Sequence, residues 1–134
     1  MKVFLGIYLL GMILVMHSLF QEKTLEQSIN DGNEIYQDFC LRCHLPDGQG
    51  QSEVFPPLSG SDYLMNDINR SIAAIKYGLK GPIVVNNVNY NSIMISQGLD
   101  EEEIADVMNY ILHSWENKST EFITPERVTS IKKN

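Results

Sequence analysis

Two thiols and an imidazole stand close together in the segment Cys40-Leu41-Arg42-Cys43-His44. The cysteines are spaced as C-x-x-C and the histidine follows at once, which is the pattern for covalent attachment of a c-type haem. Each thiol can add to a haem vinyl group, and one nitrogen of the adjacent imidazole can then bind the iron. We therefore expect one haem c, covalently bound through Cys40 and Cys43, with His44 as an iron ligand.

The same residues allow other interpretations. A thioredoxin-like C-x-x-C needs a βαβ surround, and no strand rich in Val or Ile precedes Cys40. A disulfide between Cys40 and Cys43 would close a very short loop and add little stability. A zinc site needs four ligands, and the neighbours Cys43 and His44, with His113 far along the chain, converge poorly on one small ion. A redox pair and a zinc site remain as alternatives to the favoured haem.

Length and charge restrict the class of protein. The 134 residues correspond to a single domain. Ten basic and 17 acidic residues give a net charge of −7, so we expect no binding to nucleic acid or to an anionic membrane surface. An exported chain with one close cysteine pair is also a poor disulfide framework, whereas haem attachment accounts for both thiols.

The N-terminus predicts export. Lys2 is followed by an apolar run over residues 3–16, which has the length of a signal peptide and is shorter than the ~20 residues of a membrane span. We expect residues 1–20 to be a signal peptide or an uncleaved membrane anchor, 21–27 a linker and 28–134 the folded domain. Export places that domain in the periplasm or on the outer face of the cytoplasmic membrane.

Apolar periodicity predicts three main helices. The first runs from Ser28 to Phe39 and contains Gly32, which costs about 1 kcal/mol relative to alanine. Either another helix approaches closely at Gly32, or the helix simply starts after it. The second covers 67–77 and ends at Gly78. The third begins with a capping box of Asp100 and Glu103 and carries an apolar stripe that ends at Trp115.

Shorter elements are also predicted. Thr124 and Pro125 begin a last helical turn, with Val128 and Ile131 facing inward. Segment 81–96 is irregular, although its three valines could form a short strand without an obvious partner. The predicted elements are therefore three main helices joined by long loops.

With these elements placed, the sequence resembles a class I (mitochondrial/bacterial-type) monohaem cytochrome c over residues 28–115. The motifs that carry the resemblance are Cys40-Leu41-Arg42-Cys43-His44, Pro56-Pro57-Leu58, Gly81-Pro82-Ile83-Val84-Val85-Asn86, Tyr90-Asn91-Ser92-Ile93-Met94 and Asp100-Glu101-Glu102-Glu103-Ile104-Ala105. The resemblance implies the all-α cytochrome c fold, in which three main helices and long loops wrap around one covalently bound haem. It also implies an electron carrier that is not an enzyme.

The resemblance implies a role for each matching position. His44 and Met94 would be the two axial ligands of the iron. The carbonyl of Pro56 would accept a hydrogen bond from the other ring nitrogen of His44. Leu58 would lie against the haem, and Tyr90 would either reach a haem propionate or serve only in packing.

The sixth ligand has other candidates. The family commonly has proline after the ligand methionine, and here Ile95 follows Met94. Met65 lies in a predicted loop, Met108 belongs to the apolar stripe of the third helix, and His113 falls off that stripe. Met94 is the favoured ligand because it lies on the loop before the last helix.

An iron with both axial positions filled by protein can only change its oxidation state, so we expect a one-electron carrier that shuttles electrons between respiratory redox partners. Alternatives are an electron-donor subunit of a larger reductase, oxidase or dehydrogenase complex, and a ligand-binding or peroxidatic haem protein. An apolar patch around the haem edge would indicate the donor subunit. We expect a monomer that docks transiently on redox partner proteins, through a mildly basic rim formed by Arg42, Lys76 and Lys80.

Overall fold

The computed structural model describes residues 6–8, 11–12 and 23–133, so the predicted leader over 1–20 lies largely outside the described residues. Among the described residues, no helix is both long enough and apolar enough to cross a membrane. The division into leader, linker and domain therefore stays a prediction.

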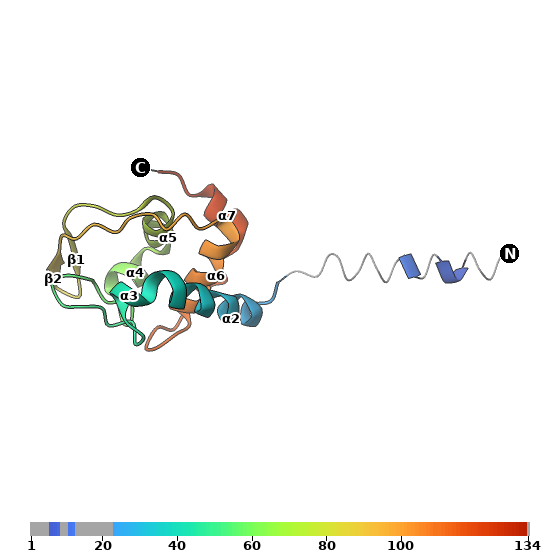
Figure 1. The fold of residues 1–134 in the computed structure, drawn as a ribbon, viewed down its shortest axis with the longest axis horizontal. Helices are drawn as coiled ribbons and strands as arrows, with labels where there is room; N and C mark the ends of the chain where they lie inside the picture. The colour runs from blue at the N-terminus through green and yellow to red at the C-terminus, as the bar shows by residue number, and fades with distance from the viewer. Residues whose placement is uncertain (1–5, 9–10, 13–22, 134) are drawn as a thin grey trace.

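About half of the described chain is helical, and one short two-stranded sheet departs from the all-α prediction (Figure 1). Its elements are α2 (Leu25–Ile35), the π-helix η1 (Tyr36–Cys40), α3 (Leu41–His44), α4 (Asp62–Asn66), α5 (Ile68–Tyr77), β1 (Ile83–Val85), β2 (Val88–Tyr90), α6 (Glu101–Leu112) and α7 (Pro125–Ser130). The three predicted helices correspond to α2, α5 and α6, and the predicted last turn is α7. Neither the π-helix nor α4 was expected.

Helix α2 begins three residues earlier than predicted. The hydroxyl of Thr24 accepts a hydrogen bond from the backbone N–H of Gln27, and the side chain of Gln27 accepts one from the N–H of Thr24. This capping box satisfies two of the free N–H groups at the helix start. Residues 25–27, predicted to be linker, are therefore helical, and Ser28 is a buried residue inside the helix.

Helices α2 and α6 cross in close contact at Gly32, as the sequence predicted. A β-carbon on Gly32 would lie 2.0 Å from the carbonyl oxygen of Asp106 and 2.9 Å from the β-carbon of Tyr110. The predicted capping box of Asp100 and Glu103 starts α6. The helix ends at Leu112, so the predicted stripe is too long: Trp115 lies beyond the end with a φ of 55°.

Packing around this crossing forms the core. The buried apolar side chains come from the helices and from the segment that leads to α7: Tyr36, Leu64, Ile72, Ile75, Ile104, Val107, Met108, Ile111, Leu112, Ile123 and Val128. Both residues predicted to face inward from the last turn do so, with Val128 fully buried and Ile131 packed against the core.

A short strand forms where the sequence predicted one, but it does not lack a partner. The three valines belong to two strands that pair with each other. Strands β1 and β2 pair antiparallel, with Ile83 opposite Tyr90 and Val85 opposite Val88. Asn86 and Asn87 connect them with φ values of 50° and 63°, the positive values that a type I′ hairpin turn requires. Asparagine tolerates this conformation better than most residues.

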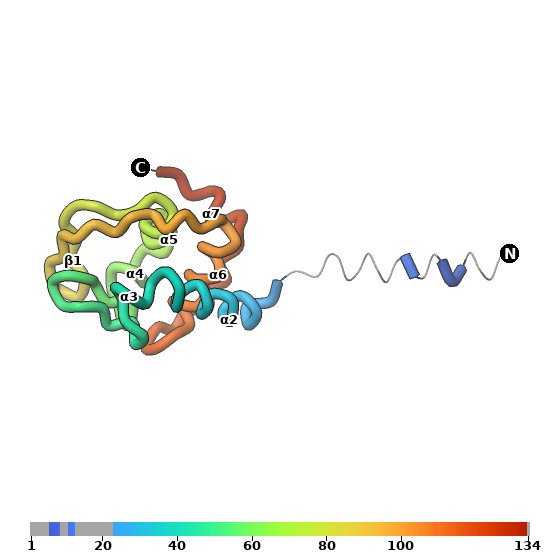
Figure 2. Tube along the Cα trace, in the orientation of Figure 1, coloured from blue at the N-terminus to red at the C-terminus, as the bar shows by residue number. Residues whose placement is uncertain are grey.

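The segments that flank the hairpin run side by side (Figure 2). Leu79 and Met94 form an isolated antiparallel bridge in which each N–H donates to the other's carbonyl, at 2.8 and 2.9 Å. Gly78 has a φ of 82° and lies directly against the backbone of Met94. A β-carbon on Gly78 would lie 2.8 Å from the carbonyl oxygen of Met94. The backbone at Met94 is thus fixed against the end of α5.

Candidate functional site

The C-x-x-C-H segment is placed by the change from α2 to the π-helix η1. The N–H of Leu41 donates to the carbonyl of Tyr36, five residues earlier. Such bulges occur frequently at functional sites. Leu45, with a φ of 65°, ends α3 directly after His44, and its carbonyl accepts a hydrogen bond from the Tyr36 hydroxyl at 2.7 Å. That bond ties Leu45 to η1 through the buried ring of Tyr36, which packs 5.3 Å from the ring of Tyr110 in α6.

The imidazole of His44 is buried and oriented by a backbone carbonyl. Its side chain is 8% exposed, and Nδ1 lies 3.0 Å from the carbonyl oxygen of Pro56, the hydrogen bond that the sequence analysis expected. Because a carbonyl can only accept, Nδ1 carries the proton and Nε2 keeps its lone pair. Burial lowers the pKa of His44, and the Pro56 carbonyl opposes this, so the ring is neutral at neutral pH and able to bind a metal.

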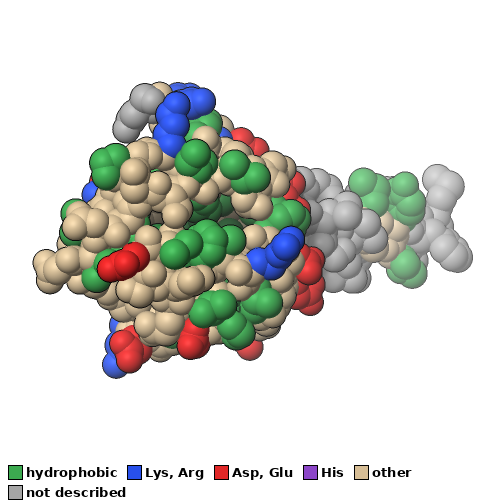
Figure 3. Space-filling model, turned by 60° about the vertical axis from the view of Figure 1, so that its left-hand side comes forward, with side chains coloured by type: hydrophobic (Ala, Val, Ile, Leu, Met, Phe, Trp, Pro, Cys, Tyr) green, Lys and Arg blue, Asp and Glu red, His purple; other side chains and the backbone are tan. Residues whose placement is uncertain are grey.

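Two hollows adjoin this imidazole. They share five lining residues: His44, Pro56, Leu79, Ile83 and Met94. Figure 3 shows a depression on the face that the hairpin occupies, with hydrophobic side chains gathered around it. The hollows therefore form one mainly apolar site, with an imidazole and a thioether in its wall.

The remaining predicted site residues divide between the two hollows. Cys40 and Leu58 line the first, and Cys43 and Tyr90 line the second. The structure thus brings together all seven residues that the sequence analysis singled out. Tyr90 is buried, and no hydrogen bond of its hydroxyl is seen among the described residues, so its predicted choice between a propionate contact and packing stays open.

The geometry opposes the alternative uses of the thiols. Both cysteines are free, and burial, assisted by the nearby Cys43 thiol, raises the pKa of Cys40 to about 11. Thioredoxin-like cysteines need the opposite shift. In the described ranges, no three or more His, Cys, Asp or Glu side chains are grouped so that they could hold a metal ion, so the zinc alternative has no support there.

Among the candidates for a second iron ligand, Met94 is the best placed. It lines both hollows and its backbone is held by Leu79. Met108 lines the first hollow but is a fully buried core residue. Met65 and His113 line neither, and His113 Nδ1 instead lies 2.8 Å from the carbonyl of Asn109.

Asn117 supports the site through its side-chain hydrogen bonds, a role that nothing in the sequence predicted. Its side-chain nitrogen donates to the carbonyls of Leu58 and Ile111, at 2.9 and 2.8 Å, and its oxygen accepts from the N–H of Gly60 at 2.9 Å. These bonds fix the loop that carries Leu58 to the end of α6. A polar residue in a loop gives no periodicity, so only the folded chain shows this role.

The expected basic rim is only partly present. Lys76 does not belong to the basic rim. Its ammonium lies 3.4 Å from the carboxylate of Glu101 and donates a hydrogen bond to the carbonyl of Val128, and the side chain is only 16% exposed. Lys80 and Arg42 are exposed, but neither lines the two hollows.

Comparison with known proteins agrees with this site. The family model described as cytochrome c matches residues 29–115. Cytochrome c-552 of Thermus thermophilus is 38% identical over 109 residues, which cover 77% of this chain and 82% of that protein. The cytochrome c subunit of the quinone alcohol dehydrogenase of Gluconacetobacter polyoxogenes is 31% identical over 105 residues, 75% of this chain but 22% of that subunit.

The chain therefore belongs to the cytochrome c family. Members of this family bind haem c and transfer electrons, and they are generally not enzymes themselves. The function of the chain is electron transfer, as a carrier or as a donor subunit.

Proposed function

We propose that this chain is an exported one-electron carrier that holds one haem c through thioether bonds to Cys40 and Cys43, with His44 and Met94 as axial ligands. One observation carries the proposal: His44 and Met94 line the same apolar site while both cysteines border it. Its place of work would be the periplasm or the outer face of the cytoplasmic membrane, and its partners an electron donor and an electron acceptor.

The residues present suit this cofactor. The Pro56 carbonyl holds the tautomer that leaves Nε2 of His44 free. The apolar lining excludes water and matches a porphyrin face. The backbone bridge to Leu79 limits movement of the chain at Met94, which would help to keep this proposed ligand in place. Bound haem c would supply an iron that changes its oxidation state by one electron.

Mass spectrometry of the native purified protein tests the proposal. The expected spectrum shows the polypeptide plus the mass of one haem, retained after denaturation, and neither cysteine reacts with an alkylating agent. The same spectrum defines the mature N-terminus, and so whether the leader is removed. A colourless, folded protein in which both thiols are alkylated would refute the proposal.

A donor subunit of a larger complex is the second candidate, and exposed apolar residues favour it. Ile93 and Ile95, on either side of Met94, are 72% and 69% exposed, and Val84 of β1 is 55% exposed. Large exposed apolar side chains at the border of a site are typical of protein contacts. Size-exclusion chromatography of the native protein at low detergent distinguishes the candidates, since a permanent subunit elutes with its partner and a carrier elutes alone.

A further inference from the structure

The backbone of Leu45, the residue directly after His44, has a conformation that is almost exclusive to glycine. Its φ is 65° and its ψ is 164°, a combination that side-chain-bearing residues rarely adopt. Strain of this kind persists only where the surrounding structure holds the residue in place, and it is concentrated at functional sites. The contacts of Leu45 therefore indicate which groups hold it.

The side chain of Leu45 does not supply that support, because it is 39% exposed. Hydrogen bonds hold its backbone instead. Its N–H donates to the carbonyl of Leu41 at 2.9 Å, which is an ordinary helical bond, and its carbonyl accepts from the N–H of Gly48 at 3.2 Å, within the same turn. The hydroxyl of Tyr36 donates to that carbonyl at 2.7 Å. Among the described residues, it is the one donor to Leu45 that comes from outside segment 41–48.

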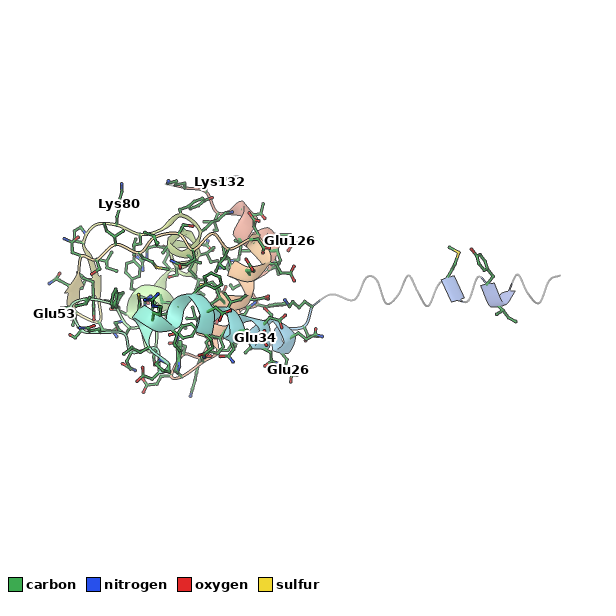
Figure 4. The ribbon with its side chains drawn as sticks, viewed as in Figure 1. Glu26, Glu34, Glu53, Lys80, Glu126 and Lys132 are labelled. Carbon is green, nitrogen blue, oxygen red and sulfur yellow. The ribbon has the colours of Figure 1, made fainter. Side chains whose placement is uncertain are left out.

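Tyr36 is a rigid anchor for this bond. Its side chain is 0% exposed, whereas Glu34, two residues earlier, lies at the outer surface of α2 (Figure 4). Its ring packs against those of Tyr110 and Trp115, with 5.3 Å between the ring centroids in each pair. Burial raises the pKa of Tyr36, so the hydroxyl keeps its proton and remains a donor.

The turn that Leu45 begins is connected to His44 at two points. The N–H of Gly50 donates to the backbone carbonyl of His44 at 2.9 Å. Gly50 also lies against Pro56, because a β-carbon on Gly50 would stand 2.7 Å from the Pro56 carbonyl oxygen. Nδ1 of His44 donates to that same oxygen at 3.0 Å. A displacement of Leu45 would therefore move Gly50, and with it the carbonyl that orients the imidazole.

We propose that Tyr36 is a positioning residue for the iron ligand: its hydroxyl holds Leu45 in the strained conformation and so fixes the orientation of the His44 imidazole. The inference rests on the proposed function in one respect, the role of His44 as an axial ligand. A tyrosine that only fills the core could be replaced by phenylalanine without effect on the imidazole, because the two rings occupy the same space. The hydroxyl is therefore the group to remove.

NMR of the haem-loaded protein tests the proposal through Tyr36→Phe. In the oxidised protein, the spread of the haem methyl signals depends on the orientation of the axial ligands, so we expect this spread to change. In the reduced protein, the Nδ1 proton of His44 should exchange with water about fivefold faster, the factor that corresponds to loss of one ordinary hydrogen bond. Tyr110→Phe is the matched control, because Tyr110 belongs to the same aromatic cluster and no hydrogen bond of its hydroxyl is seen among the described residues. It should leave both properties unchanged.

A second substitution, Leu45→Gly, tests whether strain is what the hydroxyl opposes. Glycine adopts the conformation of Leu45 without strain, so the effect of Tyr36→Phe should largely disappear when both substitutions are present. If Tyr36→Phe alone fails to fold, the double variant should still give haem-loaded protein in the yield of Leu45→Gly.

Three outcomes would overturn the proposal. One is the same haem methyl spread and the same exchange rate in wild type and Tyr36→Phe. Another is an equal change in Tyr110→Phe, since it assigns the effect to the aromatic cluster and not to the bond with Leu45. The third is an undiminished effect of Tyr36→Phe in the presence of Leu45→Gly, failure of the double variant to fold included.

Mass spectrometry of each protein beforehand separates this inference from the proposed function. Wild-type protein without attached haem refutes the proposed function. Haem-loaded variants with unchanged spectra refute only the role of the Tyr36 hydroxyl.

Discussion

The α-carbon of Gly32 lies so close to Asp106 that a β-carbon on it would stand 2.0 Å from the Asp106 carbonyl oxygen. The two helices therefore touch backbone to backbone at this point. The side chain of Asp106 binds the same partner helix: it accepts a hydrogen bond from the Ser28 hydroxyl at 2.6 Å and one from the Lys23 ammonium at 2.6 Å. A steric contact and a partly buried ionic network centred on Asp106 thus act at one crossing.

Gly32→Ala should destabilise the protein strongly. The added methyl group has no space unless α2 moves away from α6, and overpacking of this kind costs on the order of 3 kcal/mol. Chemical denaturation of the haem-loaded protein measures the loss. Glu34→Ala is the control, because Glu34 is an exposed residue of the same helix. It should change the free energy of unfolding by less than about 0.5 kcal/mol. Equal stability of the two variants would contradict the contact at Gly32.

Lys23→Met should destabilise the protein in a pH-dependent way. Removal of the ammonium leaves the buried carboxylate of Asp106 without its partly exposed ionic partner, at a cost on the order of 1–2 kcal/mol. Burial by itself lowers the pKa of Lys23, but hydrogen bonds to Asp106, Asp31 and Glu102 outweigh this and raise the pKa above its usual value of 10.5.

The sign of the pH dependence follows from the raised pKa. The stabilisation by Lys23 is fully present below pH 10.5, the unfolded value, and is lost as the pH rises through the folded value. The difference in free energy of unfolding between wild type and Lys23→Met should therefore stay constant from neutral pH to about 10 and shrink above it. A difference that grows with alkaline pH would show that the ion pair is not its source.

Met94→Leu tests the sixth ligand. The haem should stay attached through the two cysteines, so the mass is unchanged apart from the substitution. The weak near-infrared absorption band of methionine-ligated ferric haem should disappear, the reduction potential should fall, and carbon monoxide should bind the reduced protein. Met65→Leu, at a residue outside both hollows, should leave all three properties unchanged. Loss of the band in the Met65 variant alone would transfer the role to that residue.

Asn117→Ala should weaken the loop that borders the site. Truncation leaves the N–H of Gly60 and the carbonyls of Leu58 and Ile111 without their partner, which costs roughly 2–3 kcal/mol for buried groups. Hydrogen exchange should become faster at Gly60. Asn89→Ala, an exposed position on β2, is the control, and an equal loss of stability there would refute the special role of Asn117.

The sequence was sufficient for features that depend on local chemistry. The capping box of Asp100 and Glu103, the glycine end at Gly78 and the inward position of Val128 are all set by residues close in sequence, and each is confirmed. The close approach at Gly32 was also predicted, because a glycine inside a helix needs a compensating contact.

Features that depend on contacts distant in sequence were missed. The π-helix before Leu41 and the hydrogen bonds of Asn117 arise from tertiary packing, which leaves no periodicity. The start of α2 was missed although Thr24 and Gln27 form a recognisable capping box, and the hairpin was missed although Asn86-Asn87 is a turn signal. Lys76 was assigned to the rim because its partner Glu101 lies 25 residues further along the chain in another helix.

The continuous helical run from Leu25 to His44, which includes the π-helix η1, has a consequence for whatever precedes it. Lys23 precedes that run and the cysteine pair lies near its other end, roughly 25 Å away at the rise of an α-helix; Figure 1 shows α2 and α3 at the two ends of the run. A reporter, a linker or a lipid-embedded segment joined ahead of Lys23 is consequently kept a helix length away from the thiols, and can be exchanged without crowding the two hollows beside them.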